Sequence, residues 1–88
     1  MFEIEFSKNF AKNLDKLQIK TVKRFYSDLN LITVNPFPSN ERVDIKKLQG
    51  QNNHYRLRVG KYRFLFTIID NKLIIYFYDL GSRGDIYK

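Results

Sequence analysis

The sequence contains no cysteine and only one histidine among its 88 residues. Without cysteine, no disulfide can stabilise the fold, and no thiolate can bind a metal or attack a substrate. Small secreted domains usually depend on disulfides, so we expect an intracellular, cytoplasmic protein. The single histidine, His54, excludes any mechanism that needs two imidazoles.

Long apolar runs and clustered carboxylates are also missing. No segment approaches the roughly 20 apolar residues of a membrane helix, and Glu3 and Glu5 stand where a signal peptide would be basic. Asp70, Asp79 and Asp85 lie apart in the second half, so they predict no two-metal site. We expect a soluble, unprocessed chain with no metal, no other cofactor and no membrane partner.

The sequence is instead rich in aromatic and basic residues. Hydrophobic residues make up 43% of the chain and include eight Phe and six Tyr, which suits one small, densely packed domain spanning residues 1–88. The net charge is +7, and it is uneven: residues 1–44 hold seven Lys/Arg and six Asp/Glu, whereas residues 45–88 hold nine and three. A basic half indicates an anionic partner, which could be nucleic acid, a membrane surface or an acidic protein.

The first half of the sequence predicts one strand and two helices. Residues 1–6 alternate as in a half-buried strand, and Ser7 stands where a helix cap belongs. Apolar residues then follow at helical spacing to residue 17, and again from about residue 18 to residue 32. Pro36 and Pro38 end the helical region. The basic residues on the opposite helical face are interpreted as solvated; they are Lys16, Lys20, Lys23 and Arg24.

The second half predicts a short edge strand at residues 45–48, a turn at residues 50–53 and a three-stranded antiparallel meander. Its strands are residues 55–59, 62–69 and 72–79, followed by a tail at residues 81–88. Gly60-Lys61 suits a two-residue type II′ turn, and Asp70-Asn71 is interpreted as a second two-residue turn. The predicted class is therefore α+β, with an N-terminal strand, a two-helix hairpin and the meander forming one sheet packed on the helices.

These turns predict which side chains share a face of the sheet. Arg58 falls opposite Arg63, and the second turn places Arg63 opposite Tyr78. The face expected to pack on the helices carries Tyr55, Leu57, Val59, Tyr62, Phe64, Phe66, Ile68, Leu73, Ile75 and Phe77. The other face carries Arg56, Arg58, Arg63, Tyr76 and Tyr78, with Leu65, Thr67, Ile69 and Ile74 toward its far end.

The arginines of that second face favour phosphate binding. Like charges directly opposite each other destabilise a sheet, and an anion between Arg58 and Arg63 would relieve this. Arginine matches phosphate oxygens, and nearby tyrosines such as Tyr76 and Tyr78 can stack on RNA bases. The alternative is a basic face that serves solubility or docks an acidic partner. If the protein cuts RNA, we expect metal-free attack by the substrate's own 2′-hydroxyl, assisted by positioning and positive charge.

Three motifs together resemble the RelE/ParE toxin family. Residues 55–66, YRLRVGKYRFLF, are similar to the family's YRLRvGdYRvvY core, residues 47–50 match its KLkG, and residues 81–87 resemble its GhRgdvY ending. The resemblance spans essentially the whole chain. It implies a fold related to microbial ribonucleases and a toxin inhibited by a cognate antitoxin protein. RelE-like members cleave mRNA in the A site of the ribosomal 30S subunit, whereas ParE-like members inhibit DNA gyrase.

The RelE-like resemblance also implies catalytic roles. Arg56 and Arg58 would stabilise the transition state, with Arg56 also a candidate to activate the 2′-hydroxyl, and Arg63 would grip the scissile phosphate. Arg83 would assist the leaving 5′-oxygen, and Tyr87 would stack on the base and orient or deprotonate the nucleophile. Because a guanidinium stays protonated, Tyr87 is a better base than Arg56.

Further RNA-binding candidates are Lys47, His54, Lys61, Tyr76 and Tyr78. His54 is otherwise a turn or surface residue, and the two tyrosines are otherwise surface supports. Leu65, Ile69 and Ile74 are candidates for an apolar patch that the antitoxin covers. We expect mRNA and the ribosome as the other partners. Two alternatives stay open, a gyrase inhibitor of ParE type and an RNA-binding member without catalytic activity.

Overall fold

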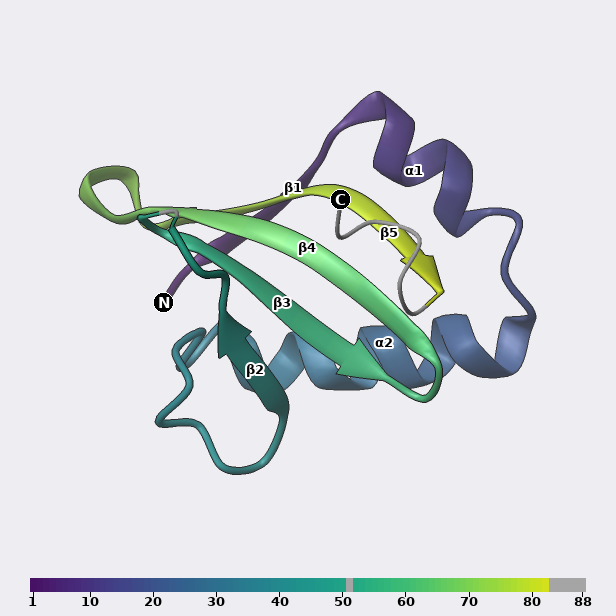
Figure 1. Ribbon diagram of the computed structural model, residues 1–88, viewed down its shortest axis with the longest axis horizontal. Coiled ribbons are helices and arrows are strands. Elements are labelled where there is room, and N and C mark those ends of the chain that lie inside the picture. The colour runs from purple at the N-terminus through teal and green to yellow at the C-terminus, as the bar shows by residue number, and fades with distance from the viewer. Residues whose placement is uncertain (51, 83–88) are drawn as a thin grey trace.

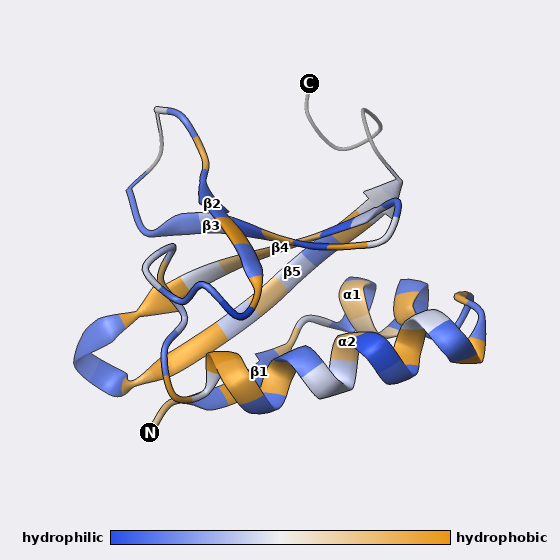
Figure 2. Ribbon diagram, turned by 90° about the horizontal axis from the view of Figure 1, so that it is seen from below, coloured by the Kyte–Doolittle hydropathy of each residue, from blue (hydrophilic) through white to orange (hydrophobic). Residues whose placement is uncertain are grey.

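A five-stranded mixed sheet with two helices on one side forms the fold (Figures 1 and 2). The computed structural model describes residues 1–50 and 52–82. The elements are β1 (Glu3–Phe6), α1 (Lys8–Leu14), α2 (Ile19–Ile32), β2 (Asp44–Lys47), β3 (His54–Val59), β4 (Tyr62–Ile69), a 3-10 turn (Asp70–Lys72) and β5 (Ile74–Ser82). The strand order is β1-β5-β4-β3-β2, with β1 parallel to β5 and the other pairs antiparallel. The predicted α+β class is confirmed.

The second helix, α2, begins and ends where the sequence predicts, whereas α1 ends at Leu14, because the chain turns before Leu17, to which the helical spacing extended. The Ser7 hydroxyl accepts a hydrogen bond of 3.0 Å from the Phe10 amide, so Ser7 caps α1 as expected. α2 starts after Gln18, and its buried stripe is Phe25, Leu29 and Ile32. No helix in residues 1–50 and 52–82 is long and apolar enough to cross a membrane.

The core between helices and sheet is dominated by phenyl rings. Phe10, Phe25, Phe64, Phe66 and Phe77 are completely buried. The rings of Phe25 and Phe64 stack at 4.4 Å between centroids, which joins α2 to the middle of the sheet. Aromatic pairs of this kind add about 0.5–1.5 kcal/mol to the energy of burial alone. The rings therefore fix the helices against one face of the sheet.

The β3–β4 hairpin has the predicted register. Val59 pairs with Tyr62 and Arg58 with Arg63. Gly60 adopts φ 60°, the left-handed conformation that the first position of a type II′ turn requires. A glycine holds this conformation without strain. The turn chemistry thus sets the pairing of the two arginines.

The β4–β5 hairpin corrects the predicted second turn. Ile69 pairs with Ile74 rather than Lys72, because the chain makes a 3-10 turn at Asp70–Lys72 and places Leu73 at φ 55°. Asp70-Asn71 lacks the glycine that favours a tight two-residue turn, and the chain forms a four-residue loop instead. Leu73 is consequently 46% exposed and does not belong to the core face. The shift of two residues keeps Ile75 and Phe77 on the predicted side.

A β-bulge between Leu65 and Phe66 changes the register again. Phe66 pairs with Phe77 but Leu65 pairs with Asp79, so Tyr78 is an extra residue in β5. The predicted pairing of Arg63 with Tyr78 is therefore wrong, and Arg63 lies opposite Gly81. β5 also continues through Ser82, beyond the predicted end at residue 79.

Candidate functional site

The outer face is the side of the sheet turned away from both helices, and its central residues form a row across four strands. Asp44 of β2 pairs with Arg58 of β3, Arg58 pairs with Arg63 of β4, and Arg63 pairs with Gly81 of β5. We call these four residues the arginine row. The row confirms the predicted pairing of Arg58 with Arg63, and it adds a carboxylate that the sequence analysis did not include.

Asp44 bridges two arginines of β3. Its Oδ1 accepts a hydrogen bond of 2.9 Å from Arg56 Nη1, and its Oδ2 accepts one of 2.8 Å from Arg58 Nε. The backbone oxygen of Asp44 accepts a further bond of 3.1 Å from Arg56 Nη1. Charge-assisted bonds of this kind hold side-chain geometry well. The bridge therefore orients both guanidinium groups and cancels one of their two charges.

The two bridged arginines differ in accessibility. The side chain of Arg56 is 8% exposed, whereas that of Arg58 is 49% exposed. A buried charge needs a hydrogen-bonded partner, and Asp44 is that partner for Arg56. In the described contacts, Arg58 donates to Asp44 through Nε only. A ligand would therefore contact the terminal amino groups of the Arg58 guanidinium.

The arginines also control the ionisation of Asp44. Its partial burial raises the pKa, but the hydrogen bonds and charges of Arg56 and Arg58 lower it further, so the pKa lies below its usual value. The carboxylate therefore stays charged at neutral pH.

A second pair occupies the far end of the outer face. His54 Nδ1 and the Tyr78 hydroxyl share a hydrogen bond of 3.0 Å, and their rings meet edge to face at 5.5 Å. His54 precedes Arg58 by four residues on β3, about 13 Å at the usual strand rise. Tyr76 is half-buried on β5, opposite Thr67 of β4. The structure thus places His54 with Tyr78, away from the arginine row.

Both predicted RNA-binding lysines, Lys47 and Lys61, lie off the outer face. Successive side chains of β2 point to opposite faces of the sheet. Lys46 pairs with Arg56 and lies on the outer face, whereas Lys47 pairs with Tyr55 and points to the other face. Lys61 lies in the β3–β4 turn, with Nζ 5.5 Å from the centroid of the Tyr62 ring. The sequence analysis missed Asp44 and Lys46, although the period-two alternation from Ile45 was enough to place both on one face.

The predicted apolar patch is smaller than expected. Leu65 is only 5% exposed, since it lies in the interior of the sheet between Arg56 and Asp79. Ile69 and Ile74 pair with each other at the end of the sheet and are half-buried. The expectation that Leu65 forms part of an exposed patch is therefore wrong.

Two predicted catalytic residues, Arg83 and Tyr87, lie outside the described residues. Across residues 1–50 and 52–82, no group of three His, Asp or Glu side chains converges in a way that could hold a metal ion. The arginine row offers binding and charge stabilisation by guanidinium groups.

Comparisons with known proteins match almost the whole chain. The family described as the ParE toxin of the type II toxin–antitoxin system parDE matches residues 4–87. The RelE1 protein of Methanocaldococcus jannaschii is 32% identical over 87 residues, which cover 99% of this chain and 96% of the relative.

Solved structures show the same architecture. A chain of the RelE–RelB complex from Pyrococcus horikoshii OT3 is similar with a TM-score of 0.81 and 26% identity, covering 96% of this chain and 97% of that one. A chain of the RelB–RelE antitoxin–toxin complex from Methanococcus jannaschii is similar with a TM-score of 0.75 and 31% identity, covering 94% of each. Sequence and fold therefore point to the same group of proteins.

Proposed function

The chain belongs to the RelE/ParE superfamily of toxins of type II toxin–antitoxin systems, and on that premise we propose that it is an endoribonuclease that cuts mRNA in the ribosomal A site. The observation that supports this best is the pairing of Arg58 with Arg63 on the outer face. A single carboxylate, Asp44, lies in the same row and engages Arg58 from the other side.

This pairing suits one phosphate group. Side chains directly opposite on neighbouring antiparallel strands have Cβ atoms about 4.5–5.5 Å apart, so both guanidinium groups can reach the same phosphate. Arg58 presents its terminal amino groups, and Gly81 on the far side of Arg63 adds no side chain to block the approach. In this proposal Arg58 and Arg63 grip the scissile phosphate of the RNA.

The proposed reaction is an internal transfer that needs no added reactant. The 2′-hydroxyl attacks the adjacent phosphorus, its proton passes to a base, and the bond to the 5′-oxygen breaks as that oxygen takes up a proton. The products are a 2′,3′-cyclic phosphate and a 5′-hydroxyl end. Negative charge accumulates on the phosphoryl oxygens in the transition state, where guanidinium groups stabilise it most.

Arg56 takes a positioning role in this proposal. It is nearly buried and donates to both the carboxylate and the backbone oxygen of Asp44. Its charge therefore fixes Asp44, and Asp44 in turn fixes Arg58. Direct activation of the 2′-hydroxyl by Arg56 is disfavoured, because Nη1 of Arg56 already donates to Asp44 and a guanidinium group has no acceptor atom.

The proton transfers are assigned to the two residues implied by the family resemblance. Tyr87 would deprotonate or orient the 2′-hydroxyl and stack on the base, and Arg83 would assist the leaving oxygen. Both remain predictions. A tyrosine needs a neighbouring positive charge to act as a base at neutral pH.

We propose a cognate antitoxin as the protein partner. The similar chains from Pyrococcus horikoshii and Methanococcus jannaschii were solved in complexes of RelE with RelB. An acidic antitoxin segment on the outer face would compete with RNA phosphate for Arg58 and Arg63. An antitoxin complex in which both arginines stay open to solvent would contradict charge competition.

A gyrase inhibitor is the second candidate, because the matching family is described as the ParE toxin. That activity does not require a phosphate-gripping pair, so the arginine row favours RNA cleavage. An RNA-binding protein without catalytic activity is the third candidate. Such a protein would bind RNA phosphate through the arginine row but would not carry out the proton transfers that cleavage requires.

Mapping mRNA 5′ ends after inducing the protein alone in a bacterial host tests the proposal. We expect new ends within reading frames, which Arg63→Ala and Tyr87→Phe should each remove, with a rate loss of about 10²-fold or more for the arginine. Arg42→Ala is the matched control, since Arg42 is an exposed arginine in the loop before β2.

Growth arrest with intact mRNA and damaged or relaxed DNA would instead support gyrase inhibition. Cleavage that persists undiminished in Arg63→Ala would contradict the assignment of the phosphate grip. RNA binding without cleavage in the wild type would identify the third candidate.

A further inference from the structure

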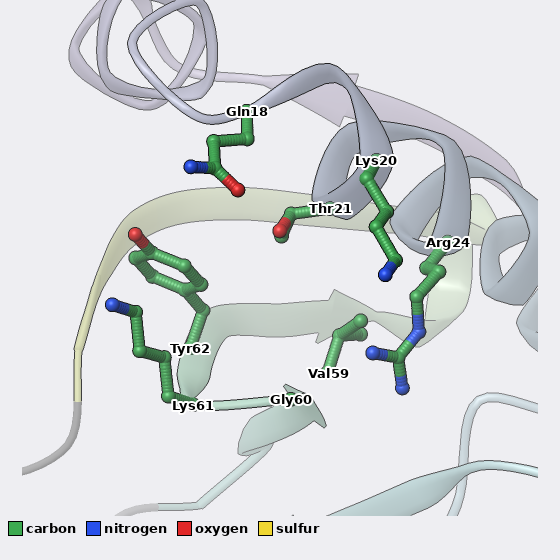
Figure 3. Close-up of a pocket in the computed structure, with 8 residues that line it drawn as sticks. All are labelled: Gln18, Lys20, Thr21, Arg24, Val59, Gly60, Lys61 and Tyr62. Carbon is green, nitrogen blue, oxygen red and sulfur yellow. The ribbon is translucent and has the colours of Figure 1, made fainter.

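A groove of about 240 Å³ lies on the opposite side of the β3–β4 turn from the arginine row. It is lined by Gln18, Lys20, Thr21, Arg24, Val59, Gly60, Lys61 and Tyr62. Figure 3 shows Lys20 and Arg24 reaching from α2 toward the turn, while Lys61 and Tyr62 extend from the hairpin. The groove thus joins the start of α2 to the tip of the hairpin.

Among the described residues that line it, the groove carries three positive charges and no carboxylate. Its cations are Lys20, Arg24 and Lys61, and all three are exposed. Both ion pairs found among residues 1–50 and 52–82 involve Asp44, on the outer face. A concave surface lined by one sign of charge concentrates ligands of the opposite sign. The groove is therefore suited to an anion.

The polar groups of the groove are mainly hydrogen-bond donors. Gln18 caps α2 without a side-chain hydrogen bond to the helix, so its amide can reach a ligand. Thr21 adds a hydroxyl, and the first turn of the 14-residue helix contributes its positive end. A β-carbon at Gly60 would lie 3.5 Å from Nη1 of Arg24, so the guanidinium rests close against the turn. An arginine fork beside lysine charges matches the oxygens of a phosphodiester.

The groove continues the basic surface of the outer face around the hairpin tip. The pair Arg58–Arg63 lies one residue further from the turn than the pair Val59–Tyr62, a distance of about 3.3 Å along the strands. Lys61 stands at the tip between the two faces. A polyanion held at Arg58 and Arg63 can therefore follow positive charge over the turn into the groove.

We propose that this groove binds a phosphodiester of the RNA strand next to the bond that is cut. The inference rests on the proposed function for the position of the cut. An acidic peptide is a poorer fit, because a peptide segment gains affinity from apolar anchors, and the apolar lining is limited to Val59, which is 3% exposed, and the Tyr62 ring. The half-buried Tyr62 ring instead offers a flat surface for a base.

Binding of a 2′-O-methyl oligoribonucleotide tests the groove apart from catalysis, because that RNA has no free 2′-hydroxyl. The test variant combines Lys20→Ala, Arg24→Gln and Lys61→Ala. The control combines Lys8→Ala, Lys12→Ala and Lys72→Ala, which removes the same charge from exposed positions outside the groove. Affinity is measured by fluorescence anisotropy over a salt series, and circular dichroism verifies that both variants fold.

We expect the slope of log K against log salt to become less steep by about 0.7 in the groove variant, since the groove is proposed to hold one phosphodiester and each lost phosphate contact on single-stranded RNA contributes about that much. The control should keep a slope near that of the wild type. Equal losses in both variants, or no loss in either, would overturn the proposal. Loss of binding to a poly-glutamate peptide with unchanged RNA affinity would overturn it in favour of an acidic protein ligand.

The mRNA 5′-end map separates this inference from the proposed function. If the wild type cuts mRNA and the groove variant binds RNA as the control does, the groove proposal fails and the function stands. If the wild type leaves mRNA intact while the groove variant alone weakens RNA binding, the function fails and the groove stands as an RNA-backbone site.

Discussion

The helix-facing side of the sheet is lined by phenyl rings, whereas the outer side carries arginines arranged around one carboxylate. On the first side, Phe25 and Phe64 are fully buried and stacked at 4.4 Å. On the second side, Arg58 is half exposed and shares Asp44 with the buried Arg56. Apolar burial stabilises the fold strongly, while exposed ion pairs contribute little. The comparison predicts that stability resides mainly on one face and ligand binding on the other.

Removing one buried ring should have the largest effect on stability. Phe64→Ala is expected to lower the free energy of unfolding by about 3–5 kcal/mol, because it deletes a fully buried ring and leaves a cavity. Urea denaturation measures this loss. Tyr26→Ala, at a ring that is 48% exposed, is the control and should cost less than half as much. Equal losses would contradict the central role of the buried rings.

Removing the shared carboxylate should have a smaller effect. Asp44→Asn is expected to cost about 1–2 kcal/mol, below the usual 3–5 kcal/mol for a broken buried pair, because the Asp44 side chain is 39% exposed and screened by water. Asp70→Asn, in the exposed 3-10 turn, is the matched control. A loss no greater than that of the control would show that Arg56 does not need its counter-charge.

Asp44 and Asp28 should contribute to the pH dependence of stability with opposite signs. The arginines hold the pKa of Asp44 below its unfolded value, so its stabilisation is present above about pH 4 and disappears as the pH falls through the folded pKa. Burial raises the pKa of Asp28 on α2 more than the Arg24 charge lowers it. Its contribution is therefore present below about pH 4 and disappears as the pH rises through the folded pKa.

Urea midpoints between pH 3 and pH 7 distinguish the two carboxylates. At neutral pH, Asp28→Asn should raise the midpoint and Asp44→Asn should lower it, and both differences should shrink toward pH 3. Shifts of the same sign would show that Asp28 and Asp44 do not differ in environment as described.

The two hairpins show how much of the fold the sequence could predict. Gly60 specifies a tight turn, and this was enough to pair Arg58 with Arg63 correctly. Asp70-Asn71 specifies its turn weakly, so the four-residue loop and the exposed Leu73 were not foreseen. The bulge at Tyr78 leaves no periodic signal, because a single inserted residue only interrupts the alternation.

The candidate site was predictable in part for a related reason. Arg58 and Arg63 lie on strands joined by a tight turn, so their pairing follows from counting residues. Asp44 lies on a strand that follows a loop, and its pairing with Arg58 depends on long-range register. The RelE/ParE resemblance is confirmed by the family match, but Arg83 and Tyr87 rest on that resemblance alone.

The bulge decides which residue of β5 becomes the neighbour of Arg63. With uninterrupted pairing from Phe66 and Phe77, Arg63 would lie opposite Leu80, and a leucine side chain would border the proposed phosphate position. The extra residue moves Leu80 into the core, where it is 8% exposed, and brings Gly81 beside Arg63. One inserted residue thus exchanges the faces to which the last residues of β5 point. Leu80 therefore packs in the core, and Gly81 leaves the outer face beside Arg63 without a side chain.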